Sequence, residues 1–274
     1  MTPQQHLTIA SAEHTTAWKY LDEVRAKRGH DGLPDWPDFC FVPVDAMRTW
    51  LRRVDPEHRP GDPARLIALG AWRAGQGSYR FEQRLSAALL ATPIPDHVPA
   101  TNLHNLPEWS VYIETPGLPG SPGFFAILDH DIGRQQGRRT ELWLLIDING
   151  RLLPTAMALP DAGTVADGLA TIGSERPAPG TDPTAHHRVA SMMRSLIAAR
   201  ISLLLYLCGS PEVAGDWPPP RPAARKTRRL GPRLYPPSKP AIWYVGEQTG
   251  EGLPEEVAAG QWHHEAGSLT WSAG

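Results

Sequence analysis

The sequence has few cysteines and no long apolar segment, and each shortage excludes a class of protein. Cys40 and Cys208 are the two cysteines of this 274-residue chain, far apart and in apolar surroundings, which excludes a disulfide framework or a cysteine-based zinc site. The most apolar run, Leu196 to Cys208, is shorter than a membrane span and contains Arg200. No apolar segment of signal-peptide length lies near the beginning of the sequence. We therefore expect a cytoplasmic protein with no membrane contact.

Strong net charge and the common catalytic motifs are lacking as well. A formal charge of −2 and a pI near 6.6 exclude a globally basic nucleic-acid binder. The segment Gly75 to Gly77 has neither the third glycine nor the preceding strand of a dinucleotide fingerprint, and the sequence contains no P-loop and no nucleophile elbow. The adjacent histidine pairs at 186–187 and 263–264 cannot easily chelate one ion on a helix. The sequence therefore predicts no cofactor and no metal.

Helical periodicity dominates the first hundred residues. With 29 Pro and 25 Gly in the chain, irregular connections are expected between the elements. Apolar spacing, with Pro63 opening one helix and Gly75 and Gly77 breaking it, predicts four helices. The predicted ranges are Thr15 to Arg28, Val44 to Val54, Asp62 to Ala74 and Tyr79 to Ala91.

From Trp109 onward the apolar period changes to two. Four strands are predicted, at Ser110 to Glu114, Phe124 to Asp129, Glu141 to Ile148 and Leu152 to Leu159. Asn149 and Gly150 are a strong two-residue hairpin signal between the last two. Helices follow at Thr164 to Ile172 and His186 to Leu207, and a strand at Ala241 to Val245. We expect an α+β fold, an antiparallel sheet of about four strands packed by N-terminal helices and the long helix.

Composition divides the chain into four parts. We expect a helical part over 1–100, which forms one fold with a sheet and long helix over 101–208, then a linker over 209–240 and a short unit over 241–274. The linker is basic and rich in proline, with seven Lys or Arg against one acid between Asp216 and Pro240. Arg225, Lys226, Arg228 and Arg229 could bind RNA or the ribosome by neutralising phosphates. Such tracts are also often solvated linkers, so both interpretations stay open.

Two aromatic segments are the best candidates for a binding surface. Leu106 to Pro116 alternates, so Trp109, Val111 and Ile113 are predicted core, while Tyr112 and Glu114 face a partner. Trp72 to Phe81 gathers aromatic rings, arginines and a glutamine around a helix break, which is typical of a recognition surface or of a buried corner. The predicted partner-binding residues are Arg73, Gln76, Tyr79, Arg80, Tyr112 and Glu114.

Four carboxylates at predicted strand ends suggest an alternative chemistry. Glu114, Asp129, Asp131 and Asp147 could converge on Mg²⁺ in a metal-dependent nuclease. Strand ends also collect turn-forming and solvated acids, and no Lys or His stands at a spacing that would complete a site. We therefore favour a structural role for these residues and a binding protein over an enzyme.

The two aromatic segments together resemble a family carried by phages and plasmids, whose members include a type V-A anti-CRISPR protein. The similarity covers about residues 40 to 160 and resumes at Trp243, Val245, Gly246 and Gly250. It is carried by Trp72, Arg73, Gln76, Gly77, Tyr79, Arg80 and Phe81, and by Leu106, Pro107, Glu108, Trp109, Val111, Tyr112, Ile113, Glu114, Thr115 and Pro116. Glu247 departs from the pattern, where a basic residue is expected, and the tail after Gly250 does not align.

The resemblance implies a protein that lowers production of a nuclease. It would recognise the nascent nuclease polypeptide during translation and cause loss of the message, and no catalytic residue carries over. A third alternative is a plasmid-maintenance scaffold that binds protein only. The predicted partner is therefore a nascent polypeptide or another protein, with RNA or the ribosome as a possible second partner.

Overall fold

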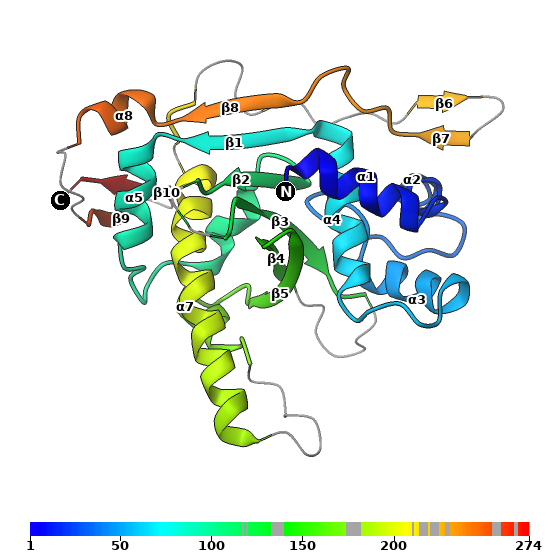
Figure 1. Cartoon of the computed structure of the whole chain (residues 1–274), viewed down its shortest axis with the longest axis horizontal. Coiled ribbons are helices and arrows are strands. Elements are labelled where there is room, and N and C mark those ends of the chain that lie inside the picture. Colours follow the sequence, from blue (N-terminus) through cyan, green and yellow to red (C-terminus); the bar gives the residue numbers. More distant parts are fainter. Residues whose placement is uncertain are drawn as a thin grey trace. The chain divides into compact units, whose positions relative to one another are not determined.

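The computed structural model describes residues 1–116, 118, 120–132, 140–173, 182–209, 211–213, 219, 225–227, 231–253, 259–265 and 268–273. The chain forms two compact units, and each unit collects three separate stretches of sequence. The first unit contains 1–80, 107–154 and 215–243, and the second contains 81–106, 155–214 and 244–274. Figure 1 shows the elements coloured along the chain.

Helices α1 to α4 belong to the first unit, with bounds Pro3–Glu13, Ala17–Ala26, Val44–Val54 and Asp62–Gly75. The sequence did not predict α1, which begins with a capping box between Thr2 and Gln5. The predictions for α2, α3 and α4 are confirmed. Helix α4 is buried along most of its length and packs against the other three helices and the sheet. It therefore forms the centre of this unit.

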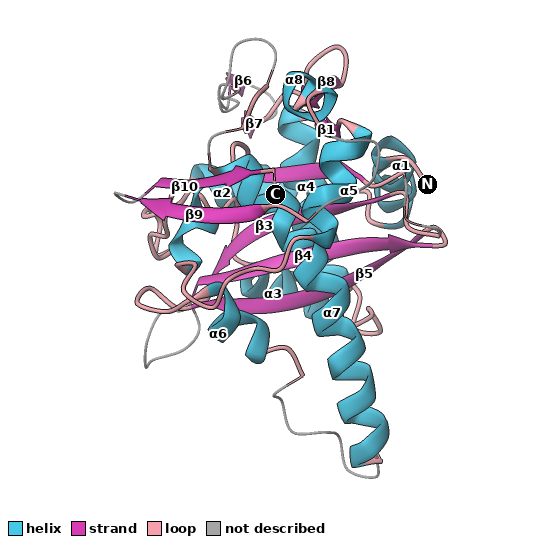
Figure 2. Ribbon diagram, turned by 90° about the vertical axis from the view of Figure 1, so that its left-hand side faces the viewer, coloured by secondary structure: helices cyan, strands magenta, loops and turns pink. Residues whose placement is uncertain are grey.

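A six-stranded sheet, whose strands are among those drawn in magenta in Figure 2, replaces the expected sheet of about four strands. Its order is β5-β4-β3-β2-β1-β8. The strands are β1 Gly77–Phe81, β2 Ser110–Glu114, β3 Gly123–His130, β4 Thr140–Ile148, β5 Arg151–Leu159 and β8 Ala241–Val245. The α+β class is confirmed, and so are the predicted β2, β3, β4, β5 and β8.

The expectation of a purely antiparallel sheet is wrong because β1 runs parallel to β2. The segment that begins at Tyr79 was expected to be helical, but the backbone leaves α4 at Gln76, which is left-handed with φ 56°. Residues 77–81 then extend along β2, and helix α5 starts at Gln83. The amide of Ala241 donates to the Gln76 carbonyl at 3.2 Å, where β8 joins the β1 edge.

Strand β2 is covered on both faces, although the alternation of its residues favours one buried face and one open face. Trp109, Val111 and Ile113 are buried as expected. Tyr112, on the opposite face, is 2% exposed, with its ring 4.8 Å from the Phe125 ring. The helices supply this cover, because Tyr112 and Phe125 join the core cluster that also contains residues of α1 to α4.

The predicted hairpin between β4 and β5 is confirmed. Asn149 and Gly150 have φ of 51° and 80°, which is the left-handed pair that a tight hairpin turn requires. Within the segment predicted as a linker, β6 (Arg225–Thr227) pairs with β7 (Gly231–Arg233). Strand β7 lies against α2, and the buried Leu234 donates its amide to Asp22 at 3.3 Å. Part of this basic segment is therefore packed within the first unit.

The second unit is mostly helical. It contains α5 Gln83–Ala91, the 3₁₀ helix η1 Ala100–Asn105, α6 Val165–Ala170, α7 Pro183–Cys208, α8 Glu247–Glu251, and the hairpin β9 Gln261–Glu265 with β10 Ser268–Ser272. The prediction of α7 is confirmed, and this helix packs against α5, η1, α6 and β10.

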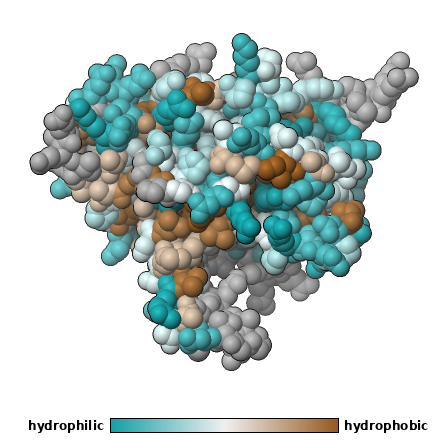
Figure 3. All heavy atoms as spheres, in the orientation of Figure 1, coloured by the Kyte–Doolittle hydropathy of each residue, from teal (hydrophilic) through white to brown (hydrophobic). Residues whose placement is uncertain are grey.

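Helix α7 is long and apolar enough over His187–Cys208 to cross a membrane by length and composition, but 56% of its most apolar window is buried inside the protein. Apolar side chains gather along α7 on the face seen in Figure 3. Leu203, Leu204 and Leu205 have no exposure, whereas Val189 and Met192 are exposed toward the other end. The buried half of α7 therefore behaves as a core helix of the second unit.

Candidate functional site

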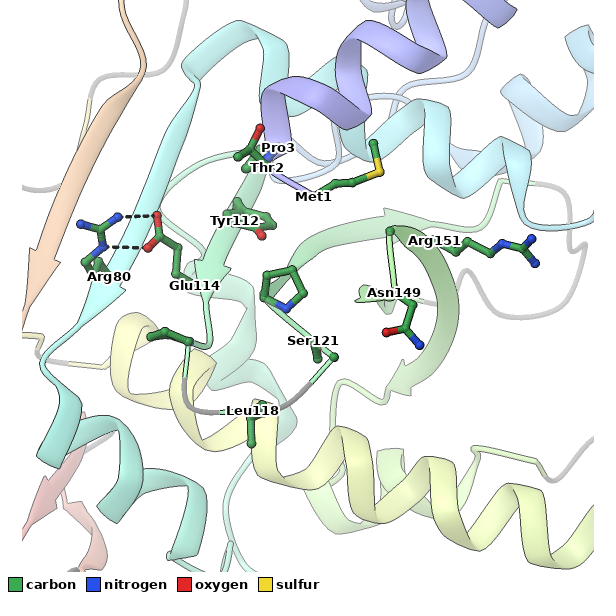
Figure 4. Close-up of a pocket in the computed structure, with 14 residues that line it drawn as sticks. Met1, Thr2, Pro3, Arg80, Tyr112, Glu114, Leu118, Ser121, Asn149 and Arg151 are labelled. Atoms are coloured by element: carbon green, nitrogen blue, oxygen red, sulfur yellow. Dashed lines mark hydrogen bonds and ion pairs between the residues drawn. The ribbon is translucent and has the colours of Figure 1, made fainter.

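A hollow of the first unit lies where β1, β2 and the β4–β5 turn meet the beginning of the chain (Figure 4). Its volume is about 960 Å³. It is lined by Met1, Thr2, Pro3, Arg80, Tyr112, Glu114, Pro116, Leu118, Gly120, Ser121, Pro122, Asn149, Gly150 and Arg151. We call this hollow the Tyr112 pocket. Three of the predicted partner-binding residues, Arg80, Tyr112 and Glu114, meet here.

An ion pair forms one end of the Tyr112 pocket. Arg80 and Glu114 are register partners in the parallel pair β1–β2, which places their side chains next to each other. The guanidinium Nε and Nη2 donate to the two carboxylate oxygens at 2.7 and 3.2 Å. The pair is partly open, with side chains 44% and 24% exposed. Figure 4 shows Arg151 at the opposite end, pointing away from this pair.

The Tyr112 hydroxyl stays protonated at this site. Burial raises the pKa of Tyr112, and the negative charges of Asp147 and Glu114 raise it further. The rest of the lining mixes the polar Ser121 and Asn149 with proline and leucine side chains. Such a mixture of apolar walls and a few fixed polar groups suits a short segment of polypeptide.

Met1, on the pocket wall, is held by a buried aspartate. The Met1 amino group and His6 Nε2 lie 2.9 and 2.8 Å from the same oxygen of Asp147, which has no exposed surface. Burial raises the pKa of Asp147, but hydrogen bonds from the amino group, His6 and the Gly150 amide outweigh it and lower the pKa. Burial also lowers the pKa of His6 against the opposing effect of Asp147. These contacts fix α1 beside the β4–β5 turn.

The other three predicted partner-binding residues lie in the interior. Arg73 pairs with Asp22 at 2.6 Å and donates to the Leu234 carbonyl at 3.1 Å. Gln76 is the left-handed residue after α4 and is 7% exposed. Tyr79 has no exposure, and its hydroxyl donates to Glu108 at 2.6 Å. The structure therefore divides the six residues into a pocket group and a buried group.

Glu108 joins the two aromatic segments, and sequence reasoning did not assign it a role. Its buried carboxylate accepts from the Tyr79 hydroxyl and from the Gly77 backbone. A Cβ at Gly75 or Gly77 would lie 1.9 Å from a Glu108 oxygen, so both positions require glycine. Burial raises the pKa of Glu108, against these hydrogen bonds. The signal in the sequence was an acid inside an otherwise apolar run.

The four strand-end carboxylates do not converge. Asp129 is register partner of Glu141 at one end of the β3–β4 pair, whereas Glu114 is register partner of Gly123 at the other end of β3. Six residues of strand separate these ends by about 20 Å. Asp129 accepts from the Val44 amide at 3.0 Å, and Asp131 follows β3 nearby. The described residues contain no group of three or more His, Cys, Asp or Glu that could hold a metal ion.

The predicted RNA-binding residues are placed only in part. Arg225 and Lys226 lie on β6, where they are register partners of Arg233 and Pro232. Arg228 and Arg229 lie outside the described residues.

Comparisons with known proteins identify the fold and the family of this chain. The crystal structure of AcrVA2 has a similar fold, with a TM-score of 0.70, 19% identity, and coverage of 100% of this chain and 98% of that chain. No curated protein matches the chain. The model of the AcrVA2-like family, the anti-CRISPR type V subtype A2 family, matches residues 79–268. The resemblance to a family with a type V-A anti-CRISPR member is thereby confirmed, and the chain belongs to the AcrVA2-like family.

Proposed function

We propose that this protein is a cytoplasmic anti-CRISPR protein that recognises a nascent nuclease polypeptide and lowers production of the nuclease through loss of its message. The observation that carries the proposal is the Tyr112 pocket, where three of the predicted recognition residues meet. Its apolar walls and partly open ion pair offer contacts for both the backbone and the side chains of an extended peptide. Recognition is therefore assigned to Arg80, Tyr112 and Glu114.

The test separates recognition of a peptide from recognition of RNA. The protein is co-expressed with a type V-A nuclease gene, and with the same gene carrying two compensating frameshifts that change the encoded peptide and leave the RNA nearly unchanged. We expect protein and message to fall together for the in-frame gene and to stay constant for the frameshifted gene. Equal loss from both genes would refute peptide recognition. Unchanged message with captured nuclease would support the scaffold alternative.

Pocket variants connect this effect to the site. Arg80→Gln and Glu114→Gln each break the ion pair, which as a partly exposed pair contributes at most about 1 kcal/mol to stability. Arg48→Gln is the matched control, because Arg48 pairs with Asp45 on α3 outside the Tyr112 pocket. We expect the two pocket variants to restore nuclease production while the control behaves as wild type. Restoration by all three variants would contradict a role for the pocket.

The nuclease alternative has its own assay. Purified protein is incubated with RNA and Mg²⁺ or Mn²⁺, beside the Asp129→Ala variant. Asp129 lies near one end of β3, and Glu114 on β2 pairs with the residue at the other end of β3, so we expect the RNA to remain intact. Cleavage that disappears in the variant would support the nuclease instead.

The basic segment is proposed to add a salt-sensitive attraction to RNA or the ribosome. Deletion of residues 225–229 should lower RNA retention and weaken its dependence on salt, since fewer phosphates are neutralised. Unchanged retention at two salt concentrations would refute this part of the proposal and leave peptide recognition untouched.

A further inference from the structure

A second groove of the first unit also borders the β4–β5 turn. It has a volume of about 660 Å³, within the range of ligand sites. It shares Gly150 and Arg151 with the Tyr112 pocket. The remaining lining residues come from α1, from α4 and the loop before it, from the end of β4 and from β5. They are His6, Ile9, Glu13, Arg59, Gly61, Asp62, Arg65, Leu69, Ile148, Leu152, Leu153 and Pro154. We call it the Leu153 groove.

Apolar side chains form much of the groove, and two of them are open to solvent. Ile9 on α1 and Leu153 on β5 are each 41% exposed. Pro154 and Leu152 continue the apolar surface along β5, and Leu69 is fully buried beneath it. Exposed aliphatic side chains that line a concave surface are typical of a protein-binding site.

The charges around the groove are unbalanced. Arg65 is held by two carboxylates, at 2.6 Å from Glu13 and 3.2 Å from Asp62. Asp62 also accepts from the Arg59 backbone amide at 2.9 Å. The side chains of Arg59 and Arg151 form no ion pair within the described part of the chain. Three arginines and two carboxylates therefore line the groove, and the exposed Arg59 and Arg151 have no ion-pair partner among the residues that the structure describes.

We propose that the Leu153 groove binds a partner polypeptide segment in which aliphatic side chains are flanked by carboxylates. The aliphatic side chains would cover Ile9 and Leu153, and the carboxylates would neutralise Arg59 and Arg151. A nucleic acid fits less well, because its phosphates would meet Glu13 and Asp62 and would leave the aliphatic surface uncovered. This site does not depend on the function proposed for the Tyr112 pocket.

Fluorescence anisotropy with a defined peptide tests the proposal on the full-length protein. The probe is a fluorescein-labelled peptide of about eight residues with central leucines flanked by glutamates, beside a charge-reversed peptide with lysines. We expect saturable binding of the glutamate peptide, with affinity at least about tenfold higher than for the lysine peptide, because two uncompensated arginines face it. No saturable binding, or equal binding of both peptides, would overturn the proposal.

Variants place the binding in the groove. Arg59→Gln and Leu153→Ser alter the Leu153 groove and leave the Tyr112 pocket intact. Arg53→Gln on α3 is the matched control, an exposed arginine outside both hollows. We expect each groove variant to weaken binding by about fivefold to tenfold and the control to leave it unchanged. Equal affinity of all variants, or an RNA oligonucleotide that binds more tightly than the peptide and loses affinity in Arg59→Gln, would refute the peptide site.

Discussion

Asp129 should make the protein less stable as the pH rises toward neutrality. The carboxylate lies at the end of β3, 6% exposed, where it accepts from the Val44 amide. Burial raises the pKa of Asp129 to about 7 from its ordinary value of 3.8, with the nearby charge of Glu141 adding to the effect against the hydrogen bond from Val44. The folded protein therefore holds this proton over a pH range in which the unfolded chain has lost it.

The sign follows from proton linkage. Because the pKa of Asp129 is higher in the folded protein than in the unfolded chain, its contribution to the free energy of unfolding is largest below about pH 4 and falls until about pH 7. Each unit of pKa difference corresponds to about 1.4 kcal/mol, which gives up to about 4 kcal/mol in total and about 2 to 3 kcal/mol between pH 5 and pH 8. Asp129→Asn keeps an oxygen that accepts from Val44 and removes the titration.

The assay is urea unfolding followed by tryptophan fluorescence at several pH values. We expect the Asp129→Asn variant to gain about 2 to 3 kcal/mol relative to wild type between pH 5 and pH 8. Taking the difference between the two proteins removes the contributions of other groups. Asp96→Asn, at an exposed position, is the control and should follow the wild type. Parallel pH profiles for wild type and Asp129→Asn would refute the reasoning.

Three further stability predictions concern the buried polar contacts. Gly77→Ala should cost about 1 to 3 kcal/mol in chemical denaturation because its Cβ would meet Glu108, whereas Gly252→Ala, with contacts of 3.6 Å or more, should have little effect. Tyr79→Phe should cost about 1 to 3 kcal/mol, since buried Glu108 loses a donor; a neutral result would show that the hydroxyl is dispensable. Asp147→Asn should lower the free energy of unfolding at neutral pH, because a carboxylate with a lowered pKa stabilises the folded state above the pKa of the unfolded chain. The variant should also lose less stability than the wild type as the pH falls, and an equal loss in both proteins would contradict this.

Local patterns predicted the elements whose structure is decided locally. The change of the apolar period to two predicted β2 to β5, and the Asn149–Gly150 pair predicted the hairpin turn, because side-chain period and turn conformation are properties of a few adjacent residues. Strand β1 was not predicted, because its apolar residues also fit a helical stripe that continues into α5. Its conformation depends on pairing with β2, about thirty residues further along the chain, which a local pattern does not contain.

The burial of Tyr112 was missed for the same reason. Alternation separates the two faces of a strand, but whether the second face meets water depends on what packs over it. Here the helical layer that includes α4 shares the core with Phe125 and Tyr112. The division of the chain into two interleaved units is equally non-local, since each unit is assembled from three stretches. Composition along the sequence reports neither property.

The two aromatic segments that carry the family resemblance are mainly one structural corner. Trp72 donates its indole N–H to the Gly77 carbonyl at 2.9 Å, and Tyr79 and Gly77 bind Glu108. Most residues that carry the family resemblance are thus explained by packing. Similarity in these residues therefore indicates a shared fold of this corner and does not by itself indicate a shared partner. The parallel register carries Arg80 and Glu114 out of the corner and into the Tyr112 pocket. A change of target within such a fold should therefore be sought at the pocket lining, where side chains can vary without disturbing the buried contacts of Glu108.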